Sequence, residues 1–338
     1  MRGRYAPSPT GAMHLGNART ALLAWLDARA AAGAFVMRVE DLDRARIVAG
    51  AEERLLADLR WLGLDWDEGP DVAGGGGPFG PYRQSERTRL YDDAIDRLLA
   101  DGAAFPGAGS RADVARAATA PHAADDDEPR YPGTCRALPA SEVEARAAAH
   151  GRKPSIRFAG ATAADAAVDD FVLRRADGVA AYQLAVVVDD IAMRITRVVR
   201  GDDLLRSTPR QLALYRALGA APPAFVHVPL VLAPGGERLA KRTRPPSIAS
   251  LRERGVAASA IVGALAASAG LASNGSRAMP ADLVVTFDWA RVPSTPVTID
   301  ERALAQCGSD DETPGRQDAR DGSGSGSDPD PGGSPPNV

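Results

Sequence analysis

The first residues that could do chemistry lie between an apolar segment and an amphipathic one. Residues 5–17 read YAPSPTGAMHLGN, and two prolines and a glycine favour a sharp turn before a helix that begins near His14. The free N–H groups and positive dipole end of a helix N-terminus bind anions, and His14 beside them can donate to a phosphate. Gly16 would let a nucleotide base approach closely. Taken alone, this motif is more typical of an ordinary turn.

A second group is acidic and follows the apolar segment 35–39. Glu40, Asp41 and Asp43 would lie at the carboxyl end of a strand, where open α/β sheets bind ligands. Such acids can hold an ammonium group, a ribose or a metal ion. Asp43 has a competing interpretation as the N-cap of a short helix over 44–47.

A third group is basic. Residues 234–242 read PGGERLAKR, which predicts a turn followed by a loop that carries Lys241. A lysine in such a loop can reach phosphates and stabilise the charge that develops during phosphoryl or adenylyl transfer. A basic loop without further context is most often solvated surface.

The elements that must position these groups alternate between strand-like and helix-like periods. Strands are expected at 2–6, 35–39, 171–175, 182–188 and 194–199, and helices at 15–32, 51–62, 86–101, 208–218 and 248–270. This alternation predicts an α/β protein with a Rossmann-like, nucleotide-binding parallel sheet flanked by helices.

Breaks in the pattern suggest how the chain is divided. We expect half of a catalytic domain at 1–101, an inserted subdomain at 102–165 with a flexible loop near 116–130, the second half at 166–245, a mostly helical region at 246–307 and a tail at 308–338. The tail is rich in Gly, Ser, Pro and Asp, so burial cannot offset its ordering entropy and it is expected to be disordered.

Length and composition are those of an ordinary globular protein. The chain has 338 residues, 45% hydrophobic and 25% charged, which excludes a wholly disordered chain and suits about two domains. The net charge is −4, of which the tail contributes −5, so the body is near neutral and its bulk charge does not predict nucleic-acid binding. Two cysteines and no apolar run of about 18 residues favour a cytoplasmic protein without membrane contact.

Together these motifs resemble a known family. Residues 8–11 and 14–17 are similar to the first signature of class I aminoacyl-tRNA synthetases, and residues 238–242 to the second. Four further segments are similar to the glutamyl branch of this family: residues 4–8, 39–43, 81–87 and 200–204. The sequence departs from the pattern in two places. Asn17 stands where the family has a histidine, and the second signature keeps only Lys241, between Arg238 and Arg242.

The stretch after the second signature separates two subfamilies. Fewer than 70 residues follow Lys241 before the tail, which is too few for a helical anticodon-binding region. The chain thus resembles the shorter glutamyl-queuosine tRNA(Asp) synthetases. That resemblance implies activation of L-glutamate by ATP with Mg²⁺, without tRNA, and transfer of glutamate to the queuosine base at the wobble position of tRNA(Asp). An ordinary glutamyl-tRNA synthetase fragment, or an inactive module that binds tRNA or a protein, are the alternatives.

The resemblance also implies roles for individual residues. The expected glutamate contacts are Arg4, Tyr5, Ala6, Pro7, Ser8, Glu40, Tyr182 and Arg200, and the expected ATP contacts are His14, Gly16, Asn17 and Lys241. His14 and Lys241 are the expected catalytic residues. Two contacts have competing interpretations: Tyr182 as a half-buried strand aromatic, and Arg200 as a surface partner of Asp202 or Asp203.

A metal site is the last implication. Relatives often place zinc in the inserted subdomain, with a Cys-x-Cys pair and a later Tyr-x-x-x-Cys. This sequence keeps Tyr131 and Cys135 but has Gly107 and Gly109 at the other two positions. One thiolate and one phenol do not satisfy a structural zinc, which takes four ligands, so we expect none.

Overall fold

The computed structural model describes residues 1–108, 131, 133–160, 168–233, 236, 247–299 and 304. Several sequence predictions lie outside the described residues: Gly109, the loop 116–130, the second signature with Lys241, Cys307 and the tail.

A parallel sheet of four strands forms the centre of the molecule. Its order is β2 (Ala34–Met37), β1 (Arg2–Tyr5), β6 (Arg197–Gly201) and β7 (Ala224–Val228). The chain runs from β1 to β2 on one side, and later enters the sheet again at β6 on the other side of β1. The strand order therefore reverses between β1 and β6, and ligands of open α/β sheets bind at the carboxyl ends of the strands at such a point.

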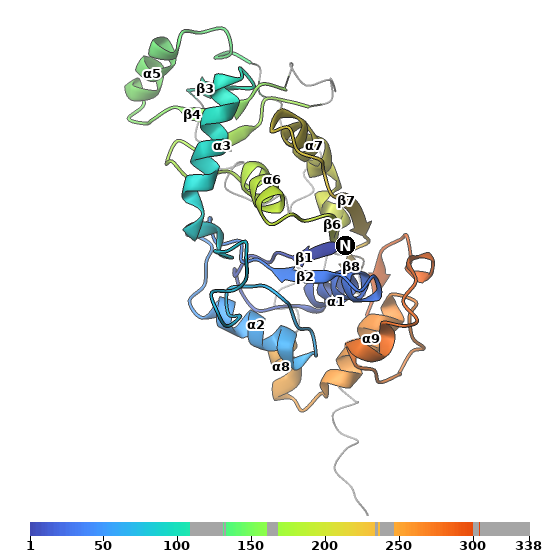
Figure 1. Ribbon diagram of the computed structural model, residues 1–338. Helices are drawn as coiled ribbons and strands as arrows, with labels where there is room; N and C mark the ends of the chain where they lie inside the picture. Colours follow the sequence, from blue (N-terminus) through green and yellow to red (C-terminus); the bar gives the residue numbers. More distant parts are fainter. Residues whose placement is uncertain are drawn as a thin grey trace, which may run out of the picture.

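Helices cover both faces of this sheet, as predicted (Figure 1). On one face α1 (Leu15–Ala30) packs with α2 (Ala51–Trp61), α8 (Ile248–Glu253) and α9 (Ala258–Ser268), and their apolar side chains share one hydrophobic core. On the other face lie α6 (Tyr182–Ala192) and α7 (Thr208–Ala217), which share a second core with α3 (Thr88–Ala100). The first core includes sheet residues such as Phe35 and Val199, whereas on the opposite face Val36 and Val198 pack in a small cluster with Tyr82, Met193 and Ile195.

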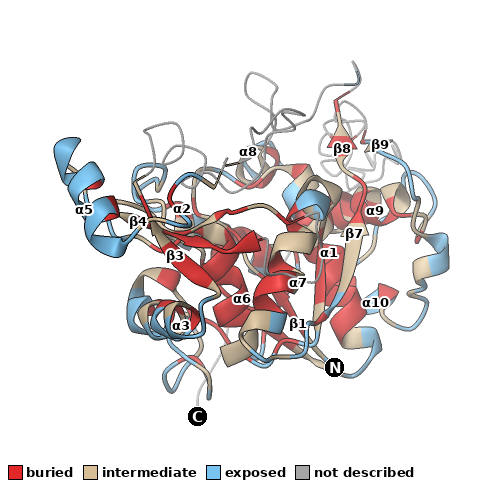
Figure 2. Ribbon diagram, turned by 90° about the horizontal axis from the view of Figure 1, so that it is seen from above, coloured by how far each residue is buried: buried red, intermediate tan, exposed pale blue. Residues whose placement is uncertain are grey.

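A smaller antiparallel sheet lies beside the second core. It contains β3 (Ala104–Gly107), β4 (Ser155–Phe158) and β5 (Val172–Arg174), with α5 (Ala140–Ala149) exposed at the edge of the molecule (Figure 2). Strand β5 follows residue 165, so this sheet extends beyond the boundary predicted for the inserted subdomain. The division into domains stays a prediction.

The remaining elements are short. The C-terminal region adds α10 (Pro280–Leu283), the 3-10 turn η5 (Trp289–Arg291) and the strand pair β8 (Val231–Leu232) and β9 (Val297–Thr298). Two more 3-10 turns, η1 (Gln84–Glu86) and η3 (Asp202–Ser207), precede α3 and α7. Within the described ranges, no helix is both long enough and apolar enough to cross a bilayer.

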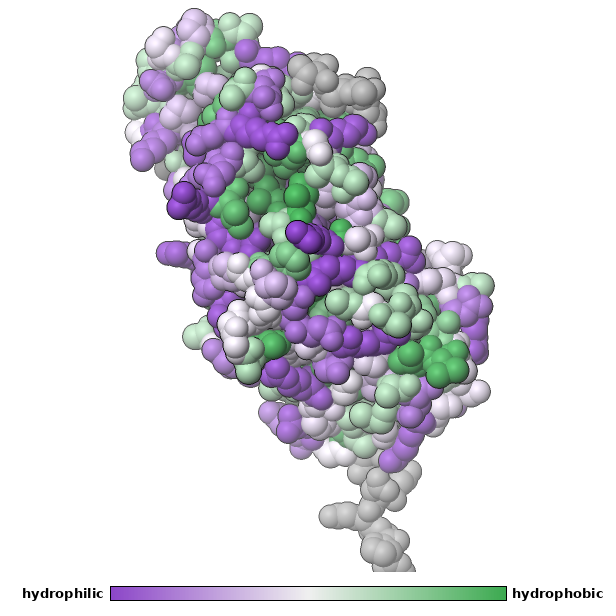
Figure 3. Space-filling model, in the orientation of Figure 1, coloured by the Kyte–Doolittle hydropathy of each residue, from purple (hydrophilic) through white to green (hydrophobic). Residues whose placement is uncertain are grey.

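Three sequence predictions of secondary structure are wrong. Residues 248–270, expected as one helix, form α8 and α9, because the chain leaves the helical conformation at Gly255, whose φ is 81°. Residues 182–188, expected as a strand, form the first part of helix α6. Leu184 to Val188 are all buried, so the helix has no polar stripe that would mark its period, and its β-branched residues favour a strand in isolation. Figure 3 shows hydrophobic residues gathered in the region of α6, with hydrophilic residues on either side. Residues 44–46, expected to belong to a short helix capped by Asp43, form a turn.

Candidate active site

The register of the central sheet places three arginines on one face. Arg4 of β1 pairs with Val36 of β2 and with Val198 of β6. Arg38 and Arg200 follow these partners by two residues, so their side chains point to the same side as Arg4. His227 of β7 pairs with Arg200 and joins them. Helix α6 covers this face, and its last turns carry Asp189 and Asp190.

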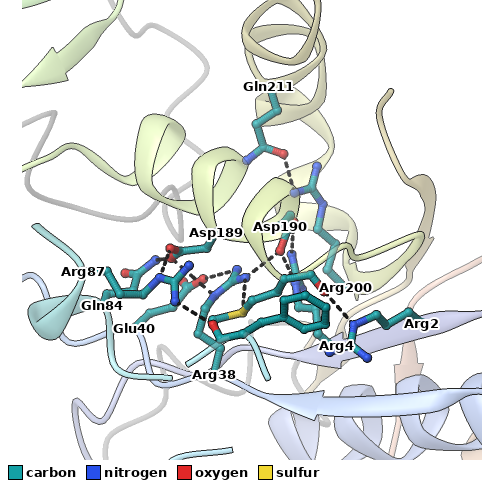
Figure 4. Close-up of polar contacts among 12 residues, drawn as sticks. Arg2, Arg4, Arg38, Glu40, Gln84, Arg87, Asp189, Asp190, Arg200 and Gln211 are labelled. Atoms are coloured by element: carbon teal, nitrogen blue, oxygen red, sulfur yellow. Dashed lines mark hydrogen bonds and ion pairs between the residues drawn. The ribbon is translucent and has the colours of Figure 1, made fainter. Parts of the chain in front are cut away.

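Asp190 holds two of these arginines. Its Oδ1 atom accepts a hydrogen bond from Arg38 Nη1 at 2.6 Å, and its two oxygens lie 3.3 and 3.4 Å from Arg4 Nε and Nη2 (Figure 4). Burial raises the pKa of Asp190, but the charges of Arg4 and Arg38 outweigh this effect and hold the pKa below its ordinary value. Asp190 is therefore an anion that neutralises the β1 and β2 side of the site.

Asp189 shares Arg38 with Asp190, since Arg38 Nε lies 3.7 Å from Asp189 Oδ2, and it has three further partners. Arg87 Nε donates to Asp189 Oδ1 at 2.6 Å and Gln84 Nε2 donates to Oδ2 at 2.8 Å. The Tyr91 hydroxyl also donates to this carboxylate. Gln84 and Arg87 directly precede α3, so these hydrogen bonds connect the start of that helix to the end of α6.

Arg200 has a different environment. It is only 3% exposed, and its partners among the described residues are neutral: Gln211 Oε1 at 2.7 Å, Thr208 Oγ1 at 2.9 Å and His227 Nε2 at 3.2 Å. The competing interpretation of Arg200 as a surface partner of Asp202 or Asp203 is therefore wrong. Burial lowers the pKa of Arg200, yet a guanidinium keeps its charge at neutral pH. The structure thus contains a buried cation whose charge the described side chains do not pair directly.

A pocket opens beside these groups. Three of the predicted glutamate contacts line it: Ser8, Glu40 and Tyr182. The other lining residues are Thr10, Leu42, Asp43, Arg46, Ile47, Gln84, Arg175, Val179 and Ala180. Glu40 Oε1 accepts from Arg38 Nη2 at 3.0 Å. Burial raises the pKa of Tyr182 to about 12, so its hydroxyl stays protonated and can donate or accept a hydrogen bond.

The formal charges of the buried groups between the sheet and α6 do not cancel. Four arginines and three carboxylates form what we call the arginine–carboxylate cluster: Arg4, Arg38, Arg87, Arg200, Glu40, Asp189 and Asp190. They leave one positive charge, and Arg200 is the member without an ion-pair partner within the described part of the chain. A ligand with one net negative charge, such as free glutamate, would balance the cluster.

The other residues of the first motif lie at the carboxyl end of strand β1 and at the start of helix α1. Tyr5 points toward α1, where its hydroxyl donates to the Asn17 carbonyl. The other predicted glutamate contacts are not among the lining residues: Arg4, Tyr5, Ala6, Pro7 and Arg200. His14 is the N-cap of α1, and its Nδ1 atom accepts from the Asn17 N–H at 3.4 Å. A side chain at Gly16 would come within 3.1 Å of the His14 ring, so glycine leaves the room that this ring occupies.

In the region where relatives often place zinc, the described residues form a small apolar core. Cys135 is buried with Phe105, Val143 and Ala159, and its sulfur lies 3.5 Å from the backbone nitrogen of Ala108. The Tyr131 hydroxyl lies 3.2 Å from the Cys135 nitrogen. The described residues contain no group of three or more His, Cys, Asp or Glu that could hold a metal. Whether the protein contains zinc stays a question for elemental analysis.

A parallel sheet with a helix N-terminus at its switch point, beside a pocket with charged lining residues, is the arrangement in which Rossmann-type enzymes bind nucleotides. Residues 1–304 match the family described as tRNA synthetases class I (E and Q), catalytic domain. The chain belongs to this family and is a ligase that uses ATP.

Individual relatives agree with this assignment. The chain is 52% identical over 317 residues to the Glutamyl-Q tRNA(Asp) synthetase of Symbiobacterium thermophilum, and the match covers 90% of this chain and 97% of that protein. It is 49% identical to the Glutamyl-Q tRNA(Asp) synthetase of Nitratidesulfovibrio vulgaris, over 88% and 95% of the two chains. The crystal structure of a glutamate tRNA ligase from Elizabethkingia meningosepticum in complex with its amino acid superposes with a TM-score of 0.74 and 29% identity, over 90% of this chain and 68% of that chain.

Sequence reasoning missed the residues that support the site from behind. Asp189, Asp190, Arg38, Gln211 and His227 carry most of its polar contacts. Paired acids directly after the apolar run 184–188 were a usable signal, because two acids at the end of a buried helix place charge on the sheet face that the helix covers. The assignment of 182–188 to a strand concealed it.

Proposed function

We propose that the protein activates L-glutamate with ATP and transfers the glutamyl group to the queuosine base of tRNA(Asp). The observation that carries the glutamate assignment is Arg200, a buried guanidinium with neutral partners beside a pocket lined by Glu40 and Tyr182. The tRNA assignment rests on the two Glutamyl-Q tRNA(Asp) synthetases, whose lengths the chain spans almost completely.

The amino acid has a natural orientation in this site. Arg200 donates three of its five N–H groups to Gln211, Thr208 and His227, which leaves one on Nη1 and one on Nη2. A carboxylate can accept from both at once, so Arg200 binds the side-chain carboxylate of glutamate. Arg4, on the neighbouring strand β1, is already paired with Asp190, and its positive charge also attracts the substrate carboxylate. Glu40 and Tyr182 are then placed to accept from the ammonium group.

The reaction is a nucleophilic displacement at phosphorus. An oxygen of the α-carboxylate attacks the α-phosphorus of ATP, the bond to the bridging oxygen breaks, and pyrophosphate leaves with Mg²⁺. Two anions must meet, so positioning and charge neutralisation provide most of the catalysis. His14 and the N-terminus of α1, with Gly16 and Asn17, are the proposed phosphate and nucleotide contacts. Lys241 lies outside the described residues and is proposed to neutralise the leaving group.

The second step transfers the glutamyl group. A hydroxyl of the queuosine diol attacks the carbonyl carbon of the adenylate, an ester forms, and AMP leaves with its electron pair while the hydroxyl proton is lost. Because the substrates are ATP and tRNA, the cytoplasm is the proposed compartment.

ATP–pyrophosphate exchange with L-glutamate and no tRNA tests the first step. With glutamate present, we expect more exchange than in a control reaction that lacks the amino acid. An inactive binding module would show no such increase. Charging assays with purified tRNA(Asp) and tRNA(Glu) test the second step. We expect glutamate on tRNA(Asp), whereas glutamylation of tRNA(Glu) alone would identify an ordinary glutamyl-tRNA synthetase fragment.

A further inference from the structure

We propose that His227 is a positioning residue for glutamate recognition: as a neutral hydrogen-bond acceptor it fixes the plane of the Arg200 guanidinium so that two N–H groups face the substrate. The proposal deepens the proposed function and rests on it for the identity of the substrate.

The contact itself fixes the chemistry of the imidazole. Arg200 Nε lies 3.2 Å from His227 Nε2, and an arginine Nε can only donate. His227 Nε2 must therefore carry a lone pair, which places the ring proton of the neutral imidazole on Nδ1. The Thr208 hydroxyl lies 3.1 Å from the same nitrogen, and it accepts from Arg200 Nη2 at 2.9 Å. These three side chains form a closed triangle of polar contacts.

The surroundings keep the His227 ring neutral and hold the Arg200 guanidinium over the Phe225 ring. Burial, reinforced by the charge of Arg200, lowers the pKa of His227 to about 4, with Asp203 opposing the shift. The groups that face the ring are thus Arg200 of β6, Asp203 of η3 and Thr208 of α7. The Phe225 ring stacks beside His227 at 6.3 Å, and the Arg200 guanidinium carbon lies 4.6 Å from the Phe225 centroid.

Each edge of the Arg200 guanidinium has a distinct role in this geometry. Nε is held by His227, while Gln211 and Thr208 each take one N–H of Nη1 and Nη2. Gln211 is itself held by Gln183 of α6, since its Nε2 atom donates to Gln183 Oε1 at 3.0 Å. Without the acceptor at position 227, the guanidinium can rotate about its Cδ–Nε bond, and the two N–H groups left for a carboxylate lose their shared direction. Glutamate binding should weaken, and ATP binding should not.

Two variants distinguish the role of the hydrogen-bond acceptor at position 227 from the role of the aromatic ring in packing. His227→Phe keeps an aromatic ring beside Phe225 but removes the acceptor, and His227→Gln keeps an acceptor at similar reach. In ATP–pyrophosphate exchange we expect His227→Phe to raise the KM for glutamate by about tenfold, with the KM for ATP within about twofold. We expect His227→Gln to stay within about threefold of the unaltered protein, and the exposed His150→Phe to match it.

Two outcomes of the exchange assay would overturn the proposal. One is an unchanged glutamate KM in His227→Phe. The other is an equal rise in both His227 variants, which would indicate packing alone. If the unaltered protein shows no glutamate-dependent exchange, the proposed function fails, and that result is separate from either of these.

A measurement on the unaltered protein does not depend on how the variants fold. The chain contains four histidines, so nitrogen-15 correlation spectra of labelled protein can resolve each imidazole. We expect the His227 ring to be the neutral Nδ1–H tautomer at pH 7, and to stay neutral at pH 5. A proton on Nε2, or an imidazolium at pH 7, would contradict the contact with Arg200 and overturn the proposal.

Discussion

Arg38 Nη1 lies 2.6 Å from Asp190 Oδ1, and this contact joins the residue after strand β2 to the last turn of helix α6 across the face of the central sheet. Both side chains are buried. The same carboxylate also pairs with Arg4. Asp190 pairs with Arg4 and Arg38 next to β1 and β2. The member of the arginine–carboxylate cluster whose charge stays unpaired among the described residues is therefore Arg200.

Removal of Arg200 should abolish tight glutamate binding. In Arg200→Ala the substrate carboxylate would be buried without its cationic partner, which costs about 2–5 kcal/mol of binding free energy. The glutamate KM in ATP–pyrophosphate exchange should rise accordingly, while the KM for ATP changes little. Arg97→Ala is the matched control, since the Arg97 side chain is 57% exposed and its ion pair among the described residues is with Asp101, the residue after α3. An unchanged glutamate KM in a folded Arg200→Ala protein would remove Arg200 from the site.

Asp190→Asn should destabilise the fold. The amide cannot balance Arg4 and Arg38, and breaking a buried ion pair from one side costs about 3–5 kcal/mol. Urea denaturation of Asp190→Asn should show this loss in the free energy of unfolding. Asp92→Asn serves as the comparison because the Asp92 side chain is 45% exposed where it meets Arg174, and such pairs contribute about 0–1 kcal/mol. Equal effects of the two substitutions would mean that Asp190 is not an essential counter-ion.

Stability should fall on the acid side because of His227. Its pKa is about 4 in the folded protein and 6.5 as the ordinary value, so the unfolded chain binds more protons between these two pH values. The free energy of unfolding therefore decreases as pH falls from about 6.5 to 4. His227→Gln lacks this proton uptake, and its stability should decrease less than that of the unaltered protein between pH 7 and pH 5. Parallel decreases in urea denaturation at the two pH values would show that His227 does not titrate with a lowered pKa.

The purified protein should contain no stoichiometric zinc. Gly107 forms the last residue of β3 opposite Ser155, and Cys135 packs among apolar side chains. Elemental analysis after dialysis is the direct measurement. One zinc per chain, lost in Cys135→Ser, would overturn this expectation and would require ligands from outside the described residues.

The parallel sheet could be predicted because its signals are local. Short apolar runs such as 35–39, followed by amphipathic segments such as 51–62, identify strands and helices without knowledge of their neighbours. Helix α6 could not be identified in this way. Its residues 184–188 are buried between the sheet and two other helices, so tertiary packing, which is not local, overrides the strand preference of Val186 to Val188.

The candidate site could be predicted in part for a similar reason. Arg4, Glu40 and Arg200 lie at strand ends, where motif and resemblance both point. The residues that support them could not be predicted in this way. His227 lies on β7, a strand that was not expected from the sequence, and the register of β6 and β7 brings it next to Arg200. Tyr5 was expected to contact glutamate like its neighbour Arg4. Arg4 points to the α6 side of the sheet, where it pairs with Asp190, and alternation along the strand turns Tyr5 toward α1 on the other side.

Delivery of glutamate to queuosine is tested with two preparations of tRNA(Asp), one that carries queuosine and one that lacks it, in a charging reaction with labelled glutamate and ATP. We expect label on the queuosine-containing tRNA, located in the anticodon fragment after nuclease digestion, and none on the other. Equal labelling of both preparations, or label at the 3′ end, would contradict this expectation.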